Sequence, residues 1–170
     1  MREEQRVVIT GMGAITPNGH DPEAPWEAVR SGRSGIDVLS GEEFADLAVR
    51  IGGQVRGFDA EAVLPRTLAR RLSPIQHWAI AAADQALAQA GIREAGTRED
   101  GAEALPWERE RVGVIAATGS GPVDAMQAAT RSLLADGPRS VPLTLSIHGA
   151  PDSAAALLSQ RWDLRGPAQG

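Results

Sequence analysis

Residues 73–91 constrain the fold more than any other stretch of this chain. Ser73 is a favoured N-cap residue, Pro74 suits the first helical position, and Gln76 stands where a capping box places its glutamine or glutamate. Gly91 fits the position just after a helix end. The pattern predicts one helix in the middle of the fold, with a face whose small residues let a neighbouring element approach closely. That face carries Ile75, Trp78, Ala79, Ala82, Ala83, Ala86, Leu87 and Ala90.

The rest of the chain alternates between strand and helix patterns. Two β-branched runs, residues 7–10 and 111–118, predict buried strands. Their order among the helices predicts an α/β fold, and 170 residues suffice for one domain with a core. We further expect helices over 25–32, 123–135 and 152–162, short strands within 36–59, and a charged surface excursion over 93–109.

Composition excludes several kinds of chemistry. The chain has no cysteine and no lysine, so its 17 basic residues are all arginine. Disulfides, thiolate catalysis, cysteine zinc sites and lysine Schiff bases are therefore absent from this chain. The net charge of −5 is too small to indicate a nucleic-acid or membrane partner, and no apolar run approaches the roughly 20 residues of a membrane span. The start of the chain has no signal-peptide pattern, and we expect a cytoplasmic protein.

Gly11-Met12-Gly13 invites comparison with a dinucleotide-binding turn. That fingerprint needs a third glycine where this chain has Thr16, and Pro17 follows it. A nucleotide-binding module is therefore a weak alternative, and a tight turn leaving a buried strand is the better interpretation.

The histidines and the serine of "TGSGP" indicate little chemistry by themselves. His20, His77 and His148 lack metal-ligand spacing, so no metal site is predicted. His77 lies one residue from the apolar stripe and is expected to be a helix-surface or packing histidine. Ser120 lacks the spacing of a nucleophile elbow, which argues against a serine hydrolase.

Three arginines cluster in "LPRTLARRL". On a helix Arg66 and Arg70 share a face and Arg71 lies nearby. Such a cluster is either a solvated face or a docking patch for an anionic partner, because guanidinium groups pair well with phosphate and carboxylate.

Seven segments in order resemble one family. They are "RVVITGMGAITPNG", "WEAVRSGRSGI", "IGGQVRGFD", "RRLSPIQHWAIAAADQALAQAGI", "RVGVIAATGSG", "DGPR" and "LRGP". In order and spacing they are similar to the β-ketoacyl-acyl carrier protein synthases, most of all the elongating type of fatty-acid and type II polyketide systems. The resemblance implies a thiolase-like fold, usually dimeric, that condenses an acyl group with a malonyl unit.

The resemblance also implies that the catalytic groups lie elsewhere. The family's nucleophilic cysteine follows the motif seen here as residues 164–167, and its two histidines and lysine come later still. We therefore expect residues 1–170 to form an incomplete N-terminal half of the thiolase-like fold, stopping before the nucleophile strand, with no element after Gly166-Pro167. No catalytic residue is assigned, and the isolated half is expected to be inactive and to associate through exposed apolar faces.

Several binding roles follow from the resemblance by position. Ser120 matches a residue that gates the acyl pocket, and Leu145 matches one that reaches across the dimer interface. The acyl carrier protein would contact a basic region made of Arg66, Arg70, Arg71 and Arg139. Substrates would arrive on the carrier's phosphopantetheine, with no cofactor of the chain's own.

The chain departs from the family pattern at positions beside the expected acyl pocket and dimer interface. Asp152 stands where the family usually has asparagine, and Pro122 where glycine is common. A non-catalytic partner subunit, similar to the chain-length factors that pair with an active ketosynthase, remains the alternative to one part of an active synthase. The chain would accordingly form a homodimer or a heterodimer with a ketosynthase chain.

Overall fold

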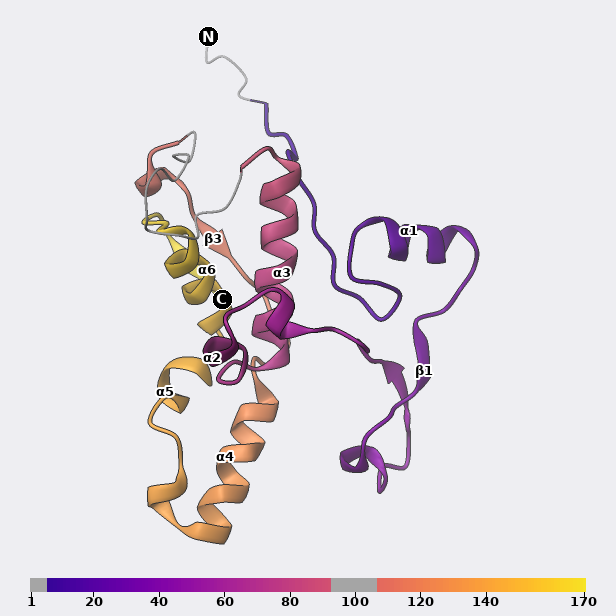
Figure 1. Ribbon diagram of the computed structural model, residues 1–170, viewed down its shortest axis with the longest axis vertical. Coiled ribbons are helices and arrows are strands. Elements are labelled where there is room, and N and C mark those ends of the chain that lie inside the picture. The colour runs from indigo at the N-terminus through magenta and orange to yellow at the C-terminus, as the bar shows by residue number, and fades with distance from the viewer. Residues whose placement is uncertain (1–5, 93–106) are drawn as a thin grey trace. The chain divides into compact units, whose positions relative to one another are not determined.

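The computed structural model describes residues 6–92 and 107–170 (Figure 1). Most of the predicted surface excursion over 93–109 lies outside these residues. The chain divides into two compact units, one formed by Met1–Arg56 and Ala82–Arg93 and the other by Gly57–Ala81 and Glu94–Gly170. Helix α3 (Pro74–Gln89) contributes its first half to the second unit and its second half to the first.

The start of α3 confirms one half of the predicted capping box. The Gln76 side chain accepts the backbone N–H of Ser73 at 2.8 Å, as the glutamine of a capping box does. The Ser73 hydroxyl makes a different bond, since it donates to the Asp124 carboxylate rather than to the first turn of its own helix. The serine therefore begins α3 and also ties it to a distant segment.

The end of α3 confirms the role predicted for Gly91. This glycine has φ +80°, a left-handed conformation that suits glycine at the position after a helix. Its N–H donates to the Ala88 carbonyl at 3.0 Å, and the Ile92 N–H donates to the Leu87 carbonyl at 2.9 Å. This pair of bonds is the Schellman motif, which satisfies the last carbonyls of the helix.

The most buried face of α3 differs from the predicted apolar stripe. Gln76, Ile80 and Ala81 are buried, whereas the eight residues of the stripe are only half-buried. Hydropathy alone cannot place Gln76 inside, because a buried amide becomes favourable only when tertiary partners take its hydrogen bonds. In the second unit Ile80 joins a small core with Leu64, Ala69, Leu72 and Leu157.

The first unit contains the helix and the short strands expected near its start. Helix α1 (Glu23–Arg30) is followed by strands β1 (Ile36–Val38) and β2 (Ile51–Gly53), with the 3₁₀ turn η1 (Glu42–Phe44) between them. The two strands are antiparallel, with Val38 opposite Ile51 and Ile36 opposite Gly53.

The buried strand predicted at residues 7–10 is wrong. The backbone there forms no strand, and Val7 is 97% exposed and Ile9 83% exposed. A β-branched run indicates a local preference for extended backbone, but the burial of a strand depends on its neighbours. Within the described ranges no strand pairs with this segment.

The glycines at 11 and 13 do not form the predicted tight turn either. This stretch crosses α3 at very close range, and the turn comes later, where Thr16 and Gly19 form a two-bond bridge. A Cβ on Gly13 would stand 1.8 Å from the Ala82 carbonyl oxygen. The glycines therefore allow two backbones to touch, which confirms the close approach expected of the small residues on α3.

The second unit contains the predicted helices α4 (Val123–Asp136) and α6 (Ser153–Trp162) and two short helices outside the predicted element order, α2 (Arg66–Ala69) and α5 (Leu145–His148). Helices α4 and α5 contact each other and are joined through η4, as Figure 1 shows in orange. The elements in chain order are η2 (Ala60–Ala62), α2 (Arg66–Ala69), η3 (Arg109–Arg111), β3 (Val114–Ile115), α4 (Val123–Asp136), η4 (Pro138–Ser140), α5 (Leu145–His148), α6 (Ser153–Trp162) and β4 (Ala168–Gln169).

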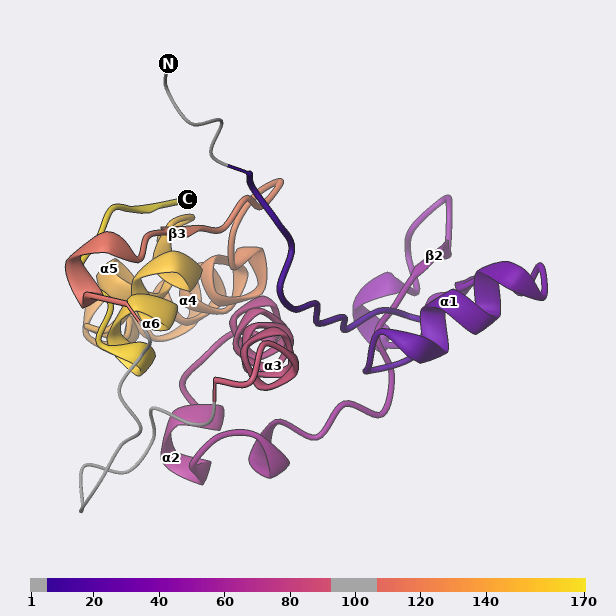
Figure 2. The same cartoon turned by 90° about the horizontal axis from the view of Figure 1, so that it is seen from above.

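Strand β3 is shorter and more exposed than the sequence predicts. It has two residues, and Ile115 is 83% exposed. It pairs in parallel with β4, Val114 opposite Ala168, and both strands contact α6, which lies beside β3 in the two views (Figures 1 and 2). An element does follow Gly166-Pro167, contrary to expectation.

The link between α6 and β4 is clamped onto η3, the turn that precedes β3. Asp163 closes α6 in the left-handed conformation, with φ 48°. Its carboxylate pairs with Arg109 and, at 3.5 Å, with Arg165. The Arg165 N–H donates to the Arg109 carbonyl at 2.9 Å, so backbone and side chains hold the same two segments together.

Within the described residues, no helix is long and apolar enough to cross a membrane.

Candidate functional site

The clustered arginines lie on the outer side of α2 and its exit. Arg66 begins this helix, Arg70 follows it with helical dihedral angles, and Arg71 comes next; all three are exposed. Ala69 and Leu72, which flank Arg70 and Arg71 in the sequence, are buried in the core of the second unit. The helical spacing of "RTLARRL" thus turns its apolar residues inward and its arginines outward. We call Arg66, Arg70 and Arg71 the α2 arginine patch.

Among the described residues, one member of the α2 arginine patch has an ion-pair partner. Arg66 Nε lies 3.5 Å from Glu61 Oε1, and both side chains are more than half exposed. Such pairs contribute at most about 1 kcal/mol, so the pairing leaves Arg66 able to exchange Glu61 for another anion.

Arg139 lies apart from the α2 arginine patch. It is exposed within η4, which follows the last turn of α4, whereas Ser73, close to the patch, bonds to Asp124 in the first turn of α4. The 14 residues of α4 place its two ends about 20 Å apart. The structure therefore does not gather the four predicted carrier-contacting arginines into one cluster.

The two predicted substrate-binding residues lie at the beginnings of helices. Ser120 is exposed in the bend before α4, where the Gly121 N–H donates to the Thr118 hydroxyl at 2.8 Å. Leu145 is the first residue of α5 and is half-buried.

A buried polar network connects the α2–α3 junction to the segments that carry these two residues. Gln76 is fully buried, and its Nε2 group donates to the His148 carbonyl at 2.8 Å and to the Ser153 hydroxyl at 2.7 Å. Its Oε1 atom accepts the Ser73 N–H, so every hydrogen-bonding group of the amide faces a partner. Sequence reasoning identified Gln76 as a capping residue but missed that it bonds to His148 and Ser153. These two partners are more than 70 positions away in the sequence, and no local pattern predicts them.

Ser73, His77 and Asp124 lie close together but do not form a catalytic triad. The serine hydroxyl donates to the aspartate and not to the histidine. His77 Nε2 lies 2.9 Å from the Ala69 carbonyl oxygen. A carbonyl only accepts, so Nε2 carries a proton and cannot serve as a base. A triad requires the serine to bond to a free imidazole nitrogen.

Acid should destabilise the protein through His77. Burial lowers the pKa of His77 below its usual 6.5, against the opposing effects of the Ala69 carbonyl and the Asp124 charge. The unfolded chain therefore binds the proton more readily, and stability falls as pH drops below 6.5 toward the pKa of the folded state. Urea unfolding between pH 7.5 and 5.5 should show a smaller loss in His77→Gln, which keeps a donor for Ala69. An equal loss of stability in the unsubstituted protein and in His77→Gln would show that His77 is not the group responsible.

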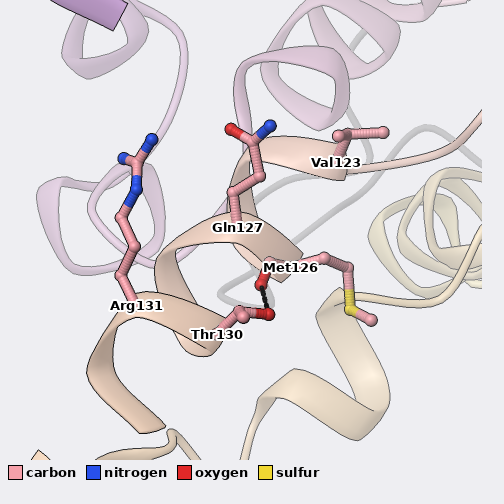
Figure 3. A pocket seen from close by; sticks show the side chains of 5 residues that line it. All are labelled: Val123, Met126, Gln127, Thr130 and Arg131. Carbon is pink, nitrogen blue, oxygen red and sulfur yellow. Dashed lines mark hydrogen bonds between the residues drawn. The ribbon is translucent and has the colours of Figure 1, made fainter. Parts of the chain in front are cut away.

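A shallow hollow of about 330 Å³ lies along α4 (Figure 3). Its lining residues all come from this one helix: Val123, Met126, Gln127, Thr130 and Arg131. The Gln127 and Arg131 side chains project in the same direction, and the Thr130 hydroxyl donates to the Met126 carbonyl at 2.9 Å. Among the residues that the structure describes, no second element lines the hollow, and neither Ser120 nor Leu145 does, so it does not correspond to the predicted acyl pocket.

In the part of the chain that the structure describes, no three histidine, aspartate or glutamate side chains gather closely enough to hold a metal ion.

Comparison with known proteins decides the family. The family model described as "Beta-ketoacyl synthase, N-terminal domain" matches residues 4–170. The chain belongs to the β-ketoacyl synthase family. Among curated relatives of this chain is the 3-oxoacyl-[acyl-carrier-protein] synthase 2 of Vibrio cholerae, 31% identical over 96% of the chain. Another is the tetracenomycin polyketide synthase ketoacyl synthase beta subunit of Streptomyces glaucescens, 36% identical over 79% of the chain.

Solved structures agree on the fold. A β-ketoacyl synthase from Burkholderia phymatum is 28% identical and superposes with a TM-score of 0.72 over 95% of this chain. Two structures at 19% identity, each with a TM-score of 0.70, share the fold: a type II polyketide ketosynthase with its acyl-carrier protein, and the ishigamide ketosynthase/chain length factor. The predicted fold class, the N-terminal half of a thiolase-like fold, is therefore confirmed.

The chain spans only part of the length of these proteins. It covers 37% of the length of the Vibrio relative, 31% of the Streptomyces relative and 38% of the Burkholderia chain.

Proposed function

We propose that this chain is the N-terminal part of an elongating β-ketoacyl-acyl carrier protein synthase, and that the carrier protein docks on the α2 arginine patch. The observation that carries the proposal is the family match across residues 4–170, on a chain that presents three exposed arginines at one helix exit. The reaction would join an acyl group to a malonyl-derived unit with loss of carbon dioxide, in the cytoplasm.

The chain's own contribution is binding and not bond making. It holds no cysteine to carry an acyl thioester and no lysine. The α2 arginine patch would attract an acidic carrier and its phosphopantetheine phosphate, because a guanidinium can make two hydrogen bonds to a phosphate or a carboxylate. Exposed charges of this kind raise the association rate more than they prolong the complex. Ser120 and Leu145 would then border the acyl chain, and a second ketosynthase chain, identical or different, would complete a dimer.

Two names among the similar proteins support the acyl carrier protein as a partner. One solved neighbour is described as an acyl-carrier protein in complex with its ketosynthase, and one relative as a 3-oxoacyl-[acyl-carrier-protein] synthase. For the present chain, the acyl carrier protein and the second ketosynthase chain are both part of the proposal.

A non-catalytic partner subunit is the second candidate. The tetracenomycin relative is named as a beta subunit, and one fold neighbour is a ketosynthase/chain length factor. In that role the chain would change the length of the product made by an active ketosynthase when the two are mixed. An unchanged product distribution would count against this role.

Reversing two charges of the α2 arginine patch tests carrier docking. Arg70→Glu combined with Arg71→Glu should weaken binding of a holo acyl carrier protein about tenfold at low salt, because two attractions of up to about 1 kcal/mol each become repulsions. Titration calorimetry or fluorescence anisotropy with a purified type II acyl carrier protein would measure the change.

The matched control keeps the same net charge. Arg33→Glu combined with Arg50→Glu reverses two exposed arginines outside the α2 arginine patch and should leave the affinity within about twofold. Equal weakening in both double variants would show attraction to overall charge rather than docking at the patch. Arg139→Glu alone would report whether a contact near η4 adds to the interface.

A further inference from the structure

We propose that Ser73 and Gln76 are positioning residues, which hold the α2 arginine patch in a fixed relation to the segments that carry Ser120 and Leu145. This inference rests on the function proposed above and adds to it a physical link between carrier docking and acyl binding.

The link begins at the end of the α2 arginine patch. Arg71 is separated from Ser73 by one residue, Leu72, which is 7% exposed and packed in the core. Ser73 is 4% exposed, and its backbone N–H is held by Gln76. Because Leu72 and Ser73 are packed and hydrogen-bonded, a displacement of the Arg70–Arg71 backbone by a bound carrier would be transmitted to Ser73. A flexible loop at this place would absorb the displacement.

From Ser73 the link passes to α4 through one hydrogen bond. The hydroxyl of Ser73 donates to the carboxylate of Asp124, which lies in the first turn of α4. Asp124 follows Ser120 by four residues, across the bend that the Gly121–Thr118 bond closes. The orientation of this bend is thus tied to the start of α3.

From Gln76 a second branch passes to the helices α5 and α6. Its amide donates to the carbonyl of His148, the last residue of α5, three residues after Leu145. The same nitrogen donates to the hydroxyl of Ser153, the first residue of α6. One fully buried side chain therefore joins the α2–α3 junction to both ends of the α5–α6 connection.

Burial makes these bonds strong enough to act as a link. Water cannot replace a lost partner of Gln76, which is fully enclosed, so a broken bond leaves a buried polar group unsatisfied. Hydrogen bonds in such a network strengthen one another, so the loss of one member weakens the others. Carrier docking and acyl binding should therefore favour each other, and the coupling must be equal in both directions.

The test uses the full chain and an exposed member of the network, Asp124. Affinity is measured for one type II acyl carrier protein in two forms, holo and octanoyl, and the ratio of the two dissociation constants reports the coupling. In the unsubstituted protein the octanoyl form should bind several-fold more tightly. Asp124→Ala removes the acceptor of the Ser73 hydroxyl and should bring the ratio close to one, while holo-carrier affinity stays within about twofold.

The conservative variant separates positioning from general destabilisation. Asp124→Asn loses the same charge but keeps an oxygen acceptor for Ser73, so it should retain most of the ratio. Ser73→Ala should behave like Asp124→Ala, because it removes the same bond from the other side. Chemical unfolding should show similar losses of stability in Asp124→Ala and Asp124→Asn, because both remove the negative charge that interacts with the start of α4. The order of the three variants in stability should therefore differ from their order in the ratio of dissociation constants.

Three results would overturn the inference. The first is an unchanged ratio of dissociation constants in Asp124→Ala and Ser73→Ala. The second is a decrease of this ratio in Asp124→Asn as large as that in Asp124→Ala. The third is a ratio of one in the unsubstituted protein. Failure of the holo carrier to bind the unsubstituted chain is a different outcome: it rejects carrier docking itself, and the inference with it.

Discussion

Gly13→Ala should destabilise the first unit by about 3 kcal/mol. The added Cβ would stand 1.8 Å from the carbonyl oxygen of Ala82 and 2.7 Å from its carbonyl carbon. Both are backbone atoms within α3, so neither can move without distorting the helix. Overpacking of this kind typically costs 1–3 kcal/mol, and contact with backbone places this case at the upper end.

The readout for Gly13→Ala is local. The side chains of Gln89 and Gln85 accept the N–H groups of Met12 and Ala14 at 2.6 and 2.9 Å. If the crossing segment separates from α3, the backbone N–H groups of Met12 and Ala14 should exchange with solvent about 100-fold faster, as a destabilisation of about 3 kcal/mol implies. Gly119→Ala is the matched control, because its Cβ would meet no atom within 4 Å. Unchanged exchange at Met12 in Gly13→Ala would show that the crossing is looser than described.

Gly166→Ala should separate β4 from β3. A Cβ at this position would lie 2.4 Å from the carbonyl oxygen of Val112 and 2.7 Å from its carbon. The same carbonyl now accepts the Gly166 N–H at 3.2 Å, so the added methyl would also break that bond. Because both strands have only two residues, the pairing has few other bonds to sustain it.

Amide exchange again gives the measurement. The N–H of Val114 donates to the Pro167 carbonyl at 2.8 Å, and the N–H of Ala116 to the Gln169 carbonyl at 2.9 Å. Both protons should lose protection in Gly166→Ala, by about 100-fold, while Gly119→Ala leaves them unchanged. Retained protection at Val114 and Ala116 would mean that the Asp163–Arg165 clamp, and not Gly166, decides the register.

These two glycines illustrate a general property of the chain. In "GMG" and "LRGP" the sequence suggests turns or exits, whereas the structure uses glycine as a contact surface between backbones. The difference lies in the partner, Ala82 in one case and Val112 in the other, which is far away in the sequence. Only the folded arrangement shows that a side chain at these positions would collide.

The local features were accessible to sequence reasoning because their causes are local. The capping glutamine and closing glycine of α3, and helices α1, α4 and α6, follow from capping chemistry and from turn residues. The outward orientation of the α2 arginine patch follows from helical spacing around Ala69 and Leu72. The family followed from seven short segments taken together, and the match over residues 4–170 confirms it.

What the tertiary structure alone decided is burial and pairing. It left Val7 and Ile9 exposed, moved the buried face of α3 to Gln76, Ile80 and Ala81, and separated Arg139 from the other arginines. It also joined Ser73 to Asp124 and Gln76 to His148. Residue type and spacing express the preferences of neighbouring residues within a few turns of chain. The free energy of burying a strand or an amide depends on atoms contributed by distant segments, and those contacts exist only in the folded protein.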